Sequence, residues 1–450
     1  MPEHKLAPLD LIQKLTDVKP HERALVGWSL LYIMTLFLAY YVLRPIRDEL
    51  GVSSGVENLP WLFTGTLITM LALNPVYSYI VKRYSRKRFI AIAYRFFAFN
   101  LAVFALLIAK APDAYQIWVG RSFFIWVSVF NLFVISVFWS FIEDVFTSGQ
   151  GKRLFGILSA GATIGGLLGS AITSGLVAHV SRTTLLLISM VLLEVAVYAS
   201  GKLANKNQTI SLNEERQSVA DNPVGGSVFA GMLHTFRSPY LLGIACFVMI
   251  YSFTSTFLYF QQANIAQVNF TTSEARVAFF ANIDFWVNAA TLFFQLFLTG
   301  RMMMGLGVLF TLCALPGVSI LGFAGLAGWP TVAVFVVAQV ARRVANFALA
   351  RPSREVLFTS VPREDRYKAK NFIDTVIYRG GDQVASWGYT GLIAIGFGVS
   401  QIAYVGIPLS LIWLILAAWL GKKHCQQEKL QEQEIPAETT HRVNNALKIH

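Results

Sequence analysis

Long apolar runs separated by short polar segments constrain this chain more than any other feature. About twenty apolar residues are enough to cross the hydrocarbon core of a bilayer, and such runs recur along the whole sequence. Inside lipid the backbone has no water to bind, so each run must satisfy its own hydrogen bonds as a helix. Only 14% of the residues are charged, whereas soluble domains usually carry about a quarter. The sequence therefore predicts an all-α membrane protein.

Twelve transmembrane helices are expected, in two sets of six. Residues 140–148 are similar to residues 353–360 with one gap, and both segments fall between the fourth and fifth spans of their set. Two six-helix halves related as a parallel repeat resemble the architecture of the major facilitator superfamily. The expected parts are a cytoplasmic N-terminus over 1–24, a six-helix bundle over 25–200, a cytoplasmic linker over 201–237, a second six-helix bundle over 238–421 and a cytoplasmic tail over 422–450.

Positive charge is distributed asymmetrically between the two sides of the predicted membrane. The formal net charge is +12, and lysine and arginine crowd the predicted inner loops at 82–88 and 363–370. The predicted outer loops hold few cations, Arg182 and Arg276 among them. The positive-inside rule then places both termini in the cytoplasm. A strongly basic soluble protein would suggest nucleic acid, but membrane topology accounts for the charge here, so no nucleic-acid partner is expected.

Patterns typical of enzymes, cofactor sites and metal sites are not found in the sequence. Cys246, Cys313 and Cys425 show no pairing or metal-ligand spacing, and no Ser-His-Asp or Cys-His set has support. We therefore expect no enzymatic activity, no cofactor and no metal. The fifth predicted span carries glycines at a spacing that favours close helix packing over ligand binding. They are Gly156, Gly161, Gly165, Gly166 and Gly169.

Charged residues within the predicted spans are the main functional candidates, because each costs a few kcal/mol in lipid. Arginine stays protonated and binds carboxylate or phosphate bidentately, so a cavity with more arginines than acids would attract an anion. The segment 371–383, charged within an otherwise apolar span, most resembles a binding site. The candidate substrate-binding residues are Arg44, Arg47, Arg351, Tyr378 and Arg379. The candidate coupling or gating residues are Glu143, Asp144, Arg354, Glu355, Asp374 and Asp382.

Structural roles stay open for individual charges. The neighbours Arg354 and Glu355 could form a packing or gating pair. The acids Glu143 and Asp144 could take up a proton, or they could form a salt bridge to Lys152 in the basic loop that follows.

Three segments resemble motifs of the nucleotide-transporter family, the ATP/ADP translocases of plastids and intracellular bacteria, and more closely their shorter bacterial relatives. Residues 43–48, Leu-Arg-Pro-Ile-Arg-Asp, are similar to the family's Leu-Arg-Asp-Thr-Lys-Asp, with Arg47 at the functional lysine. Residues 139–144, Trp-Ser-Phe-Ile-Glu-Asp, are similar to Trp-Gly-Phe-Ala-Asn-Glu, with Asp144 at the functional glutamate. Residues 373–381 are similar, with a gap, to the family's Ile-Asp and Gly-Lys-Ser-Gly segment.

The resemblance implies a major facilitator-like fold in the bacterial inner membrane and exchange of nucleotides, ATP for ADP, by alternating access. A small organic anion and the lipid bilayer would be the partners. The sequence departs from the family over 251–262, where a further glutamate has no acidic counterpart. Two other hypotheses stay open. One is a proton-coupled exporter of another polyanion, such as a carboxylate metal chelator, with Asp374, Asp382 or Glu143 and Asp144 carrying the proton. The other is a non-transporting membrane scaffold or sensor.

Overall fold

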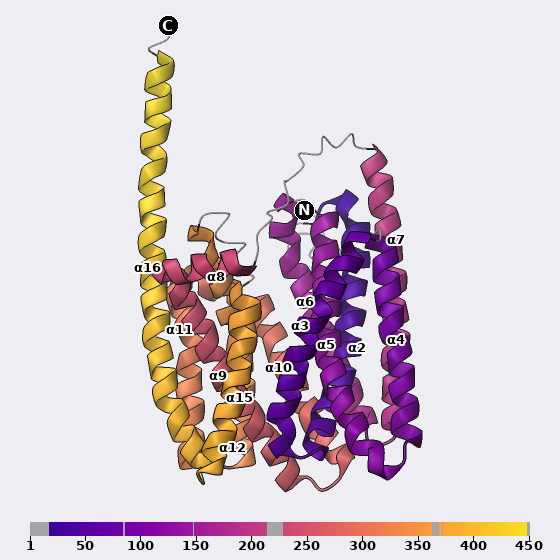
Figure 1. Cartoon of the computed structure of the whole chain (residues 1–450). Coiled ribbons are helices and arrows are strands. Elements are labelled where there is room, and N and C mark those ends of the chain that lie inside the picture. The colour runs from indigo at the N-terminus through magenta and orange to yellow at the C-terminus, as the bar shows by residue number, and fades with distance from the viewer. Residues whose placement is uncertain are drawn as a thin grey trace, which may run out of the picture. The chain divides into compact units, whose positions relative to one another are not determined.

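Helices form all regular secondary structure in the described part of the chain (Figure 1). The computed structural model describes residues 18–83, 86–146, 148–213, 228–361, 369–370 and 372–447. By its internal contacts the chain divides into two compact units. Unit 1 comprises Met1–Ala220 and Phe260–Phe293, and unit 2 comprises Asp221–Tyr259 and Phe294–His450.

The described residues include eleven helices that are long and apolar enough to cross a membrane. The remaining predicted helix, the eleventh along the chain, is divided in two: the π-helix η5 (Ile373–Ile377) leads directly into α15 (Tyr378–Ala394). Since a helix rises about 1.5 Å per residue, the two elements together reach about 30 Å, the thickness of the hydrocarbon core. The predicted all-α membrane fold of twelve helices is thereby confirmed.

Unit 1 is built around α2, which packs closely on α6. If Gly165 carried a Cβ atom, that atom would lie 2.4 Å from the backbone oxygen of Met34, and a Cβ at Gly169 would lie 2.6 Å from that of Leu38. Glycine at these two positions therefore lets the helix backbones touch, as the spacing of the glycines predicted. The helices of the N-terminal stretch are α2 (Arg23–Ser53), α3 (Leu59–Arg83), α4 (Arg86–Lys110), α5 (Asp113–Val145), α6 (Ser148–Leu176) and α7 (Arg182–Asn213), with short 3-10 turns η1 (Pro20–Glu22) and η2 (Val56–Asn58).

Two helices pass from one unit into the other. They are α9 (Pro239–Asn269) and α10 (Ser273–Phe297), and the hairpin Phe260–Phe293 that joins them belongs to unit 1. Val277 of this hairpin lies in the apolar core of unit 1, together with Tyr32 and Phe138.

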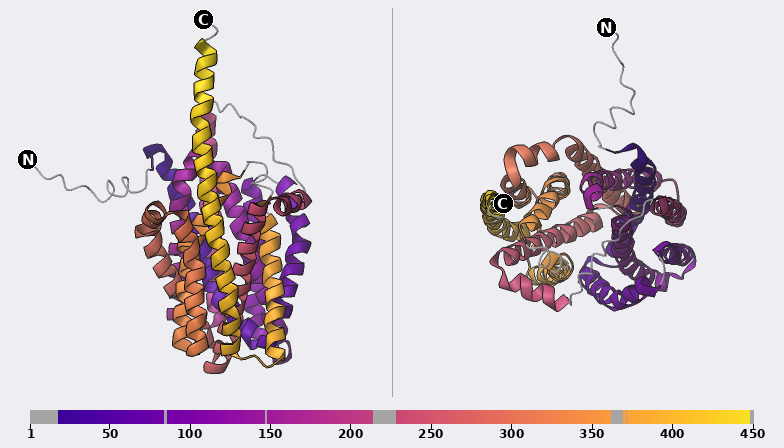
Figure 2. Two further views of the ribbon diagram at one scale, coloured as in Figure 1. Left: turned by 90° about the vertical axis from the view of Figure 1, so that its left-hand side faces the viewer. Right: turned by 90° about the horizontal axis from the view of Figure 1, so that it is seen from above.

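Unit 2 has its own apolar core, in which Trp413 is the largest fully buried side chain. Residues 201–237, predicted as a linker, contain the end of α7 and all of α8 (Val228–Arg237), while 214–227 lie outside the described residues. The other elements are α11 (Thr299–Gly328), α12 (Val332–Val344), the π-helix η3 (Ala345–Ala350), α13 (Arg351–Leu357), the 3-10 turn η4 (Phe358–Ser360) and α16 (Val399–Leu447). Helix α16 continues well past 421, the predicted end of the second bundle (Figure 2).

Both π-helices lie in unit 2, and each leads directly into a predicted site residue. Arg351 follows η3, and its backbone N–H bonds to the carbonyl of Asn346, five residues earlier. Pro352 explains this widening, because a proline lacks an N–H and its ring crowds the carbonyl four residues before it. Tyr378 follows η5 and bonds in the same way to the carbonyl of Ile373. Such π-helical turns within α-helices are frequent at functional sites.

Candidate functional site

Two tyrosines and three arginines gather in unit 2. The rings of Tyr251 on α9 and Tyr378 on α15 lie 5.9 Å apart. The guanidinium of Arg342 lies over the Tyr251 ring, 5.3 Å from its centre, and that of Arg379 lies over the Tyr378 ring at 5.5 Å. Arg351, which follows η3 directly, is the third arginine that we assign to this group. We call these five residues the tyrosine–arginine cluster.

Arg342 is the most deeply buried cation of the cluster, with 2% of the residue exposed. Its Nη2 donates to the carbonyl oxygen of Tyr251 at 3.2 Å and to Oγ1 of Thr254 at 2.9 Å. Its Nε has no hydrogen-bond partner, and no carboxylate within the described residues forms an ion pair with it. Burying a charge without a counter-ion is costly, so this position favours an anion. An arginine inside the apolar helix α12 was the available sequence signal, but the sequence prediction did not assign Arg342 to the site.

The cluster carries more cations than acids. Arg351 is exposed and forms no ion pair within the part of the chain that the structure describes. Arg379 lies 3.7 Å from Asp382, whose carboxylate also accepts hydrogen bonds from Ser252 and, at 3.2 Å, from Thr256. The cluster thus sets three arginines against one carboxylate, which is an arrangement that attracts anions.

Asp374 and Arg379, although close in sequence, have different partners. Asp374 pairs with Arg354 at 3.1 Å, and Arg354 also lies 3.9 Å from Glu355. Lys370 lies 2.5 Å from the other oxygen of Glu355. These two cations and two acids balance each other and join α13 to the start of the following span. The geometry fits the predicted gating role of Arg354, Glu355 and Asp374, which stays a prediction.

The predicted substrate residues of unit 1 are all paired with acids. Arg44 lies 3.2 Å from Asp284 on α10 and 4.0 Å from Asp48. Arg47 lies 2.5 Å from Asp48 and packs over the ring of Phe124. Asp284 is almost fully buried. The sequence prediction gave Asp284 no role, because its partner is distant along the chain.

The acids Glu143 and Asp144 are exposed near the C-terminal end of α5, whereas their neighbours Ile142 and Val145 are buried. The side chain of Lys152, their alternative partner in the sequence, lies outside the described residues. Their predicted role in gating or proton uptake stays a prediction.

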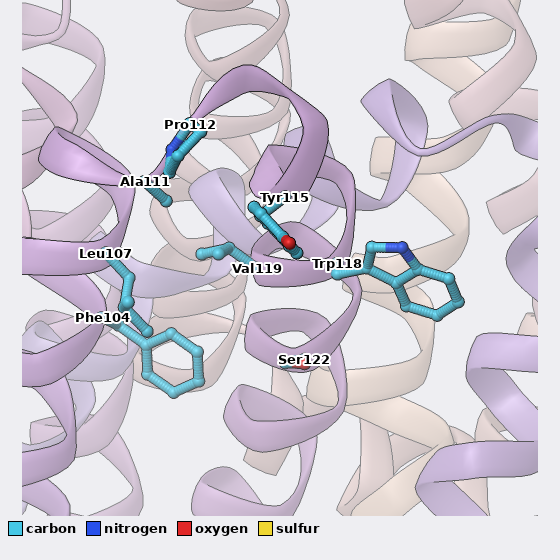
Figure 3. A pocket seen from close by; sticks show the side chains of 8 residues that line it. All are labelled: Phe104, Leu107, Ala111, Pro112, Tyr115, Trp118, Val119 and Ser122. Atoms are coloured by element: carbon cyan, nitrogen blue, oxygen red, sulfur yellow. The ribbon is translucent and has the colours of Figure 1, made fainter.

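A pocket of about 450 Å³ lies in unit 1 where α4 turns into α5 (Figure 3). Figure 3 shows Phe104 and Leu107 on one helix and Tyr115 and Trp118 on the next, with Pro112 in the turn between them. No charged side chain lines the pocket. Exposed tyrosine and tryptophan are typical of the membrane–water interface, so this pocket suits lipid chains better than an anion.

Comparisons with known proteins agree with this architecture. The family model of the Major Facilitator Superfamily matches residues 24–341. The chain is similar to ADP,ATP carrier protein 1 of Chlamydia pneumoniae, at 23% identity over 94% of this chain and 96% of the relative. It is also similar to ADP,ATP carrier protein 1 of Chlamydia muridarum (strain MoPn / Nigg), at 22% identity over 95% and 93%.

A solved structure is similar in fold. It is a bacterial homologue of the human lysosomal transporter Spinster in an inward-facing and unoccupied conformation, with a TM-score of 0.53 at 15% identity, covering 91% of this chain and 98% of that one. Since the family model covers more than half of the chain, this protein belongs to the Major Facilitator Superfamily and is a secondary membrane transporter.

Proposed function

We propose that this transporter carries an organic anion by alternating access, and that the anion is a nucleotide exchanged in the manner of ATP and ADP. One observation carries the proposal: the tyrosine–arginine cluster sets Arg342, Arg351 and Arg379 against a single carboxylate, Asp382. In a low-dielectric membrane interior such an excess of positive charge favours an anionic ligand.

The chemistry of the cluster suits a nucleotide. Guanidinium groups bind phosphate oxygens bidentately, and Arg351 and Arg379 are accessible enough to do so. Tyr251 and Tyr378 add aromatic faces beside these cations, and stacking of a base on an aromatic ring contributes about 1–3 kcal/mol. The similarity to proteins named ADP,ATP carriers supports the same substrate class.

The second candidate is proton-coupled export of another polyanion, such as a carboxylate chelator. It is favoured by Asp382, a largely buried acid that accepts hydrogen bonds from Ser252 and Thr256 beside Arg379. An acid beside a substrate arginine could exchange a proton for the substrate. In this case a pH gradient, and not internal nucleotide, would drive transport.

The orientation proposed for the chain follows from its cations. With both termini in the cytoplasm of a bacterium and the chain in its inner membrane, the basic inner loops obey the positive-inside rule. Reporter fusions after His450 and within 214–227 should both report the cytoplasmic side. A periplasmic signal at either position would contradict this topology.

Transport by the purified protein in proteoliposomes tests the proposed function. Vesicles loaded with ADP should take up labelled ATP, whereas vesicles loaded with buffer should take up much less. Arg342→Gln should reduce the exchange, and Arg301→Gln, which changes an exposed arginine on α11, should not. Uptake that requires a pH gradient and ignores internal nucleotide would replace nucleotide exchange with the second candidate.

A further inference from the structure

The hairpin Phe260–Phe293 is attached to unit 1 through a buried glutamate of α2. Glu49 is fully buried, and its carboxylate lies 3.1 Å from Arg182 at the start of α7 and 3.2 Å from Arg276 at the start of α10. Arg276 also donates to the carbonyl oxygens of Phe270 and Thr271 in the turn of the hairpin. One carboxylate therefore binds the turn of the hairpin to two helices of unit 1.

A second ion pair lies further along α10. Asp284 forms an ion pair with Arg44 at 3.2 Å, and two asparagines on the same helix contact α6. Ser174 donates to Asn282 at 2.6 Å, and Asn288 lies so close to Gly166 that a Cβ at that glycine would be 2.8 Å from its Oδ1. Polar contacts thus join α10 to α2 and α6 at several positions along its length.

The charge balance around Arg44 changes from neutral to positive when the hairpin leaves. With Asp284 in place, Arg44 and Arg47 face two carboxylates, Asp48 and Asp284. Without Asp284, the remaining carboxylate contact of Arg44 is Asp48 at 4.0 Å, which Arg47 already holds. When Arg276 moves away with the hairpin, the carboxylate of Glu49 still forms an ion pair with Arg182. Departure of the hairpin would therefore leave Arg44 as a cation that lacks a close acid.

We propose that the hairpin Phe260–Phe293 is a gate held shut by the Glu49–Arg276 and Arg44–Asp284 ion pairs, and that the transported anion opens it by taking the place of Asp284 on Arg44. This inference rests on the proposed function, in that it requires an anionic substrate. A ligand shifts a conformational equilibrium only when it binds the two states differently. Because Arg44 is available only when the gate is open, an anion binds the open state better, whereas a neutral solute does not.

A cross-linking reporter can follow the gate directly. Ser174→Cys and Asn282→Cys, placed together in a chain whose native cysteines are replaced, put two thiols where the native side chains touch. We expect rapid oxidative cross-linking of the full chain in proteoliposomes. Addition of ATP should slow it, and an uncharged nucleoside should not.

Variants of the Glu49–Arg276 and Arg44–Asp284 ion pairs, which we call the latch, then test whether these pairs hold the gate shut. Adding Asp284→Asn or Arg276→Gln to the reporter should slow cross-linking roughly tenfold or more without any substrate, as expected for a lost charged contact. Glu274→Gln is the matched control, because this acid lies on the same hairpin, is exposed and forms no ion pair within the described residues. The control should cross-link as fast as the parent. If Asp284→Asn and Arg276→Gln also cross-link as fast as the parent, the latch is refuted.

Exchanging the charges of Arg44 and Asp284 separates the two parts of the proposal, the ion pairs that hold the gate shut and the competition between the anion and Asp284 for Arg44. The combined change Arg44→Asp and Asp284→Arg keeps an ion pair but removes the cation of unit 1, so cross-linking should be as fast as in the parent and no longer slowed by ATP. A response to ATP that survives the exchange would refute the competition. If ATP has no effect on the parent but citrate slows its cross-linking, the latch stands and nucleotide fails as the substrate.

Discussion

Arg44 and Arg47 of unit 1 differ from Arg342 of unit 2 in what balances their charge. In unit 1, Arg44 and Arg47 are balanced by Asp284 and Asp48. In unit 2, Arg342 is balanced by no carboxylate within the described residues and rests on the ring of Tyr251. A paired arginine connects helices, whereas one without an acid attracts an anion. In the structure Arg44 and Arg47 therefore hold helices together, whereas Arg342 presents the cation that we propose for anion binding.

The difference has an energetic consequence. Removing one partner of a buried ion pair leaves the other charge stranded, which costs about 3–5 kcal/mol. Removing a buried charge that had no counter-ion relieves a desolvation cost instead. Loss of the cations around a buried acid of unit 1 should thus act mainly on stability, and loss of Arg342 in unit 2 on binding.

The largest effect is expected at Glu49 in unit 1. Arg182→Gln combined with Arg276→Gln would leave this fully buried carboxylate without a cation, so the free energy of unfolding should fall by about 3–5 kcal/mol. Unfolding of the purified protein in detergent measures the loss. Adding Glu49→Gln should restore much of it, and failure of this rescue would show that the carboxylate is not what the arginines stabilise.

In unit 2, Arg342→Gln should leave stability unchanged or slightly higher and weaken ATP binding. Loss of one charged contact costs about 1.5–3 kcal/mol, or roughly ten- to a hundredfold in affinity. Binding of labelled ATP and thermal unfolding, measured on the same sample, separate the two effects. A large loss of stability with unchanged affinity would place Arg342 with the structural arginines and remove the contrast between the units.

Substitution in the Arg354–Asp374 pair should have a smaller effect on stability than the Glu49 substitutions and a smaller effect on ATP affinity than Arg342→Gln. Asp374 is about a third exposed, so its ion pair should contribute only about 0–1 kcal/mol. Asp374→Asn should therefore leave both stability and ATP affinity nearly unchanged while altering the rate of exchange. If ATP affinity falls as far as in Arg342→Gln, then Asp374 belongs to the binding site and not to the gate.

The smallest effect concerns Glu22 in the 3-10 turn before α2. Burial alone would raise the pKa of this carboxyl, but hydrogen bonds from Gln150, the Lys19 backbone N–H and Arg153 lower it overall. A lowered folded-state pKa adds stability above the ordinary value of 4.5, and this stability is lost as the pH falls through the folded value. Wild type should thus lose more stability than Glu22→Gln on acidification, and equal losses would contradict the assignment.

Hydropathy predicted the helices of this protein well, because a backbone in lipid has few alternatives to a helix. The π-helices were not predicted, although Pro352 gave a local signal for one of them. An arginine-rich site was also expected, from the cost of placing charge in the membrane, and its role in binding stays a prediction.

The pairing of these charges could not be predicted in the same way. Arg44 and Asp284 are distant in sequence, so only the folded chain brings them to 3.2 Å. Asp374 and Arg379 are close in sequence, yet they do not pair with each other. Asp374 pairs with Arg354, and Arg379 pairs with Asp382. Which arginine has an acid beside it depends on tertiary packing, so the sequence alone could not show which arginines are left for the proposed anion.

Equilibrium binding of ATP to the purified transporter tests the central claim most directly. Arg351→Gln combined with Arg379→Gln removes the two accessible cations of the cluster, and Arg301→Gln combined with Lys422→Gln removes two exposed cations elsewhere in unit 2. The account predicts that the first pair lowers ATP affinity by a hundredfold or more, since each contact contributes about 1.5–3 kcal/mol, and that the second pair leaves it unchanged. Equal affinity in both double variants would show that the cluster in unit 2 does not bind the anion.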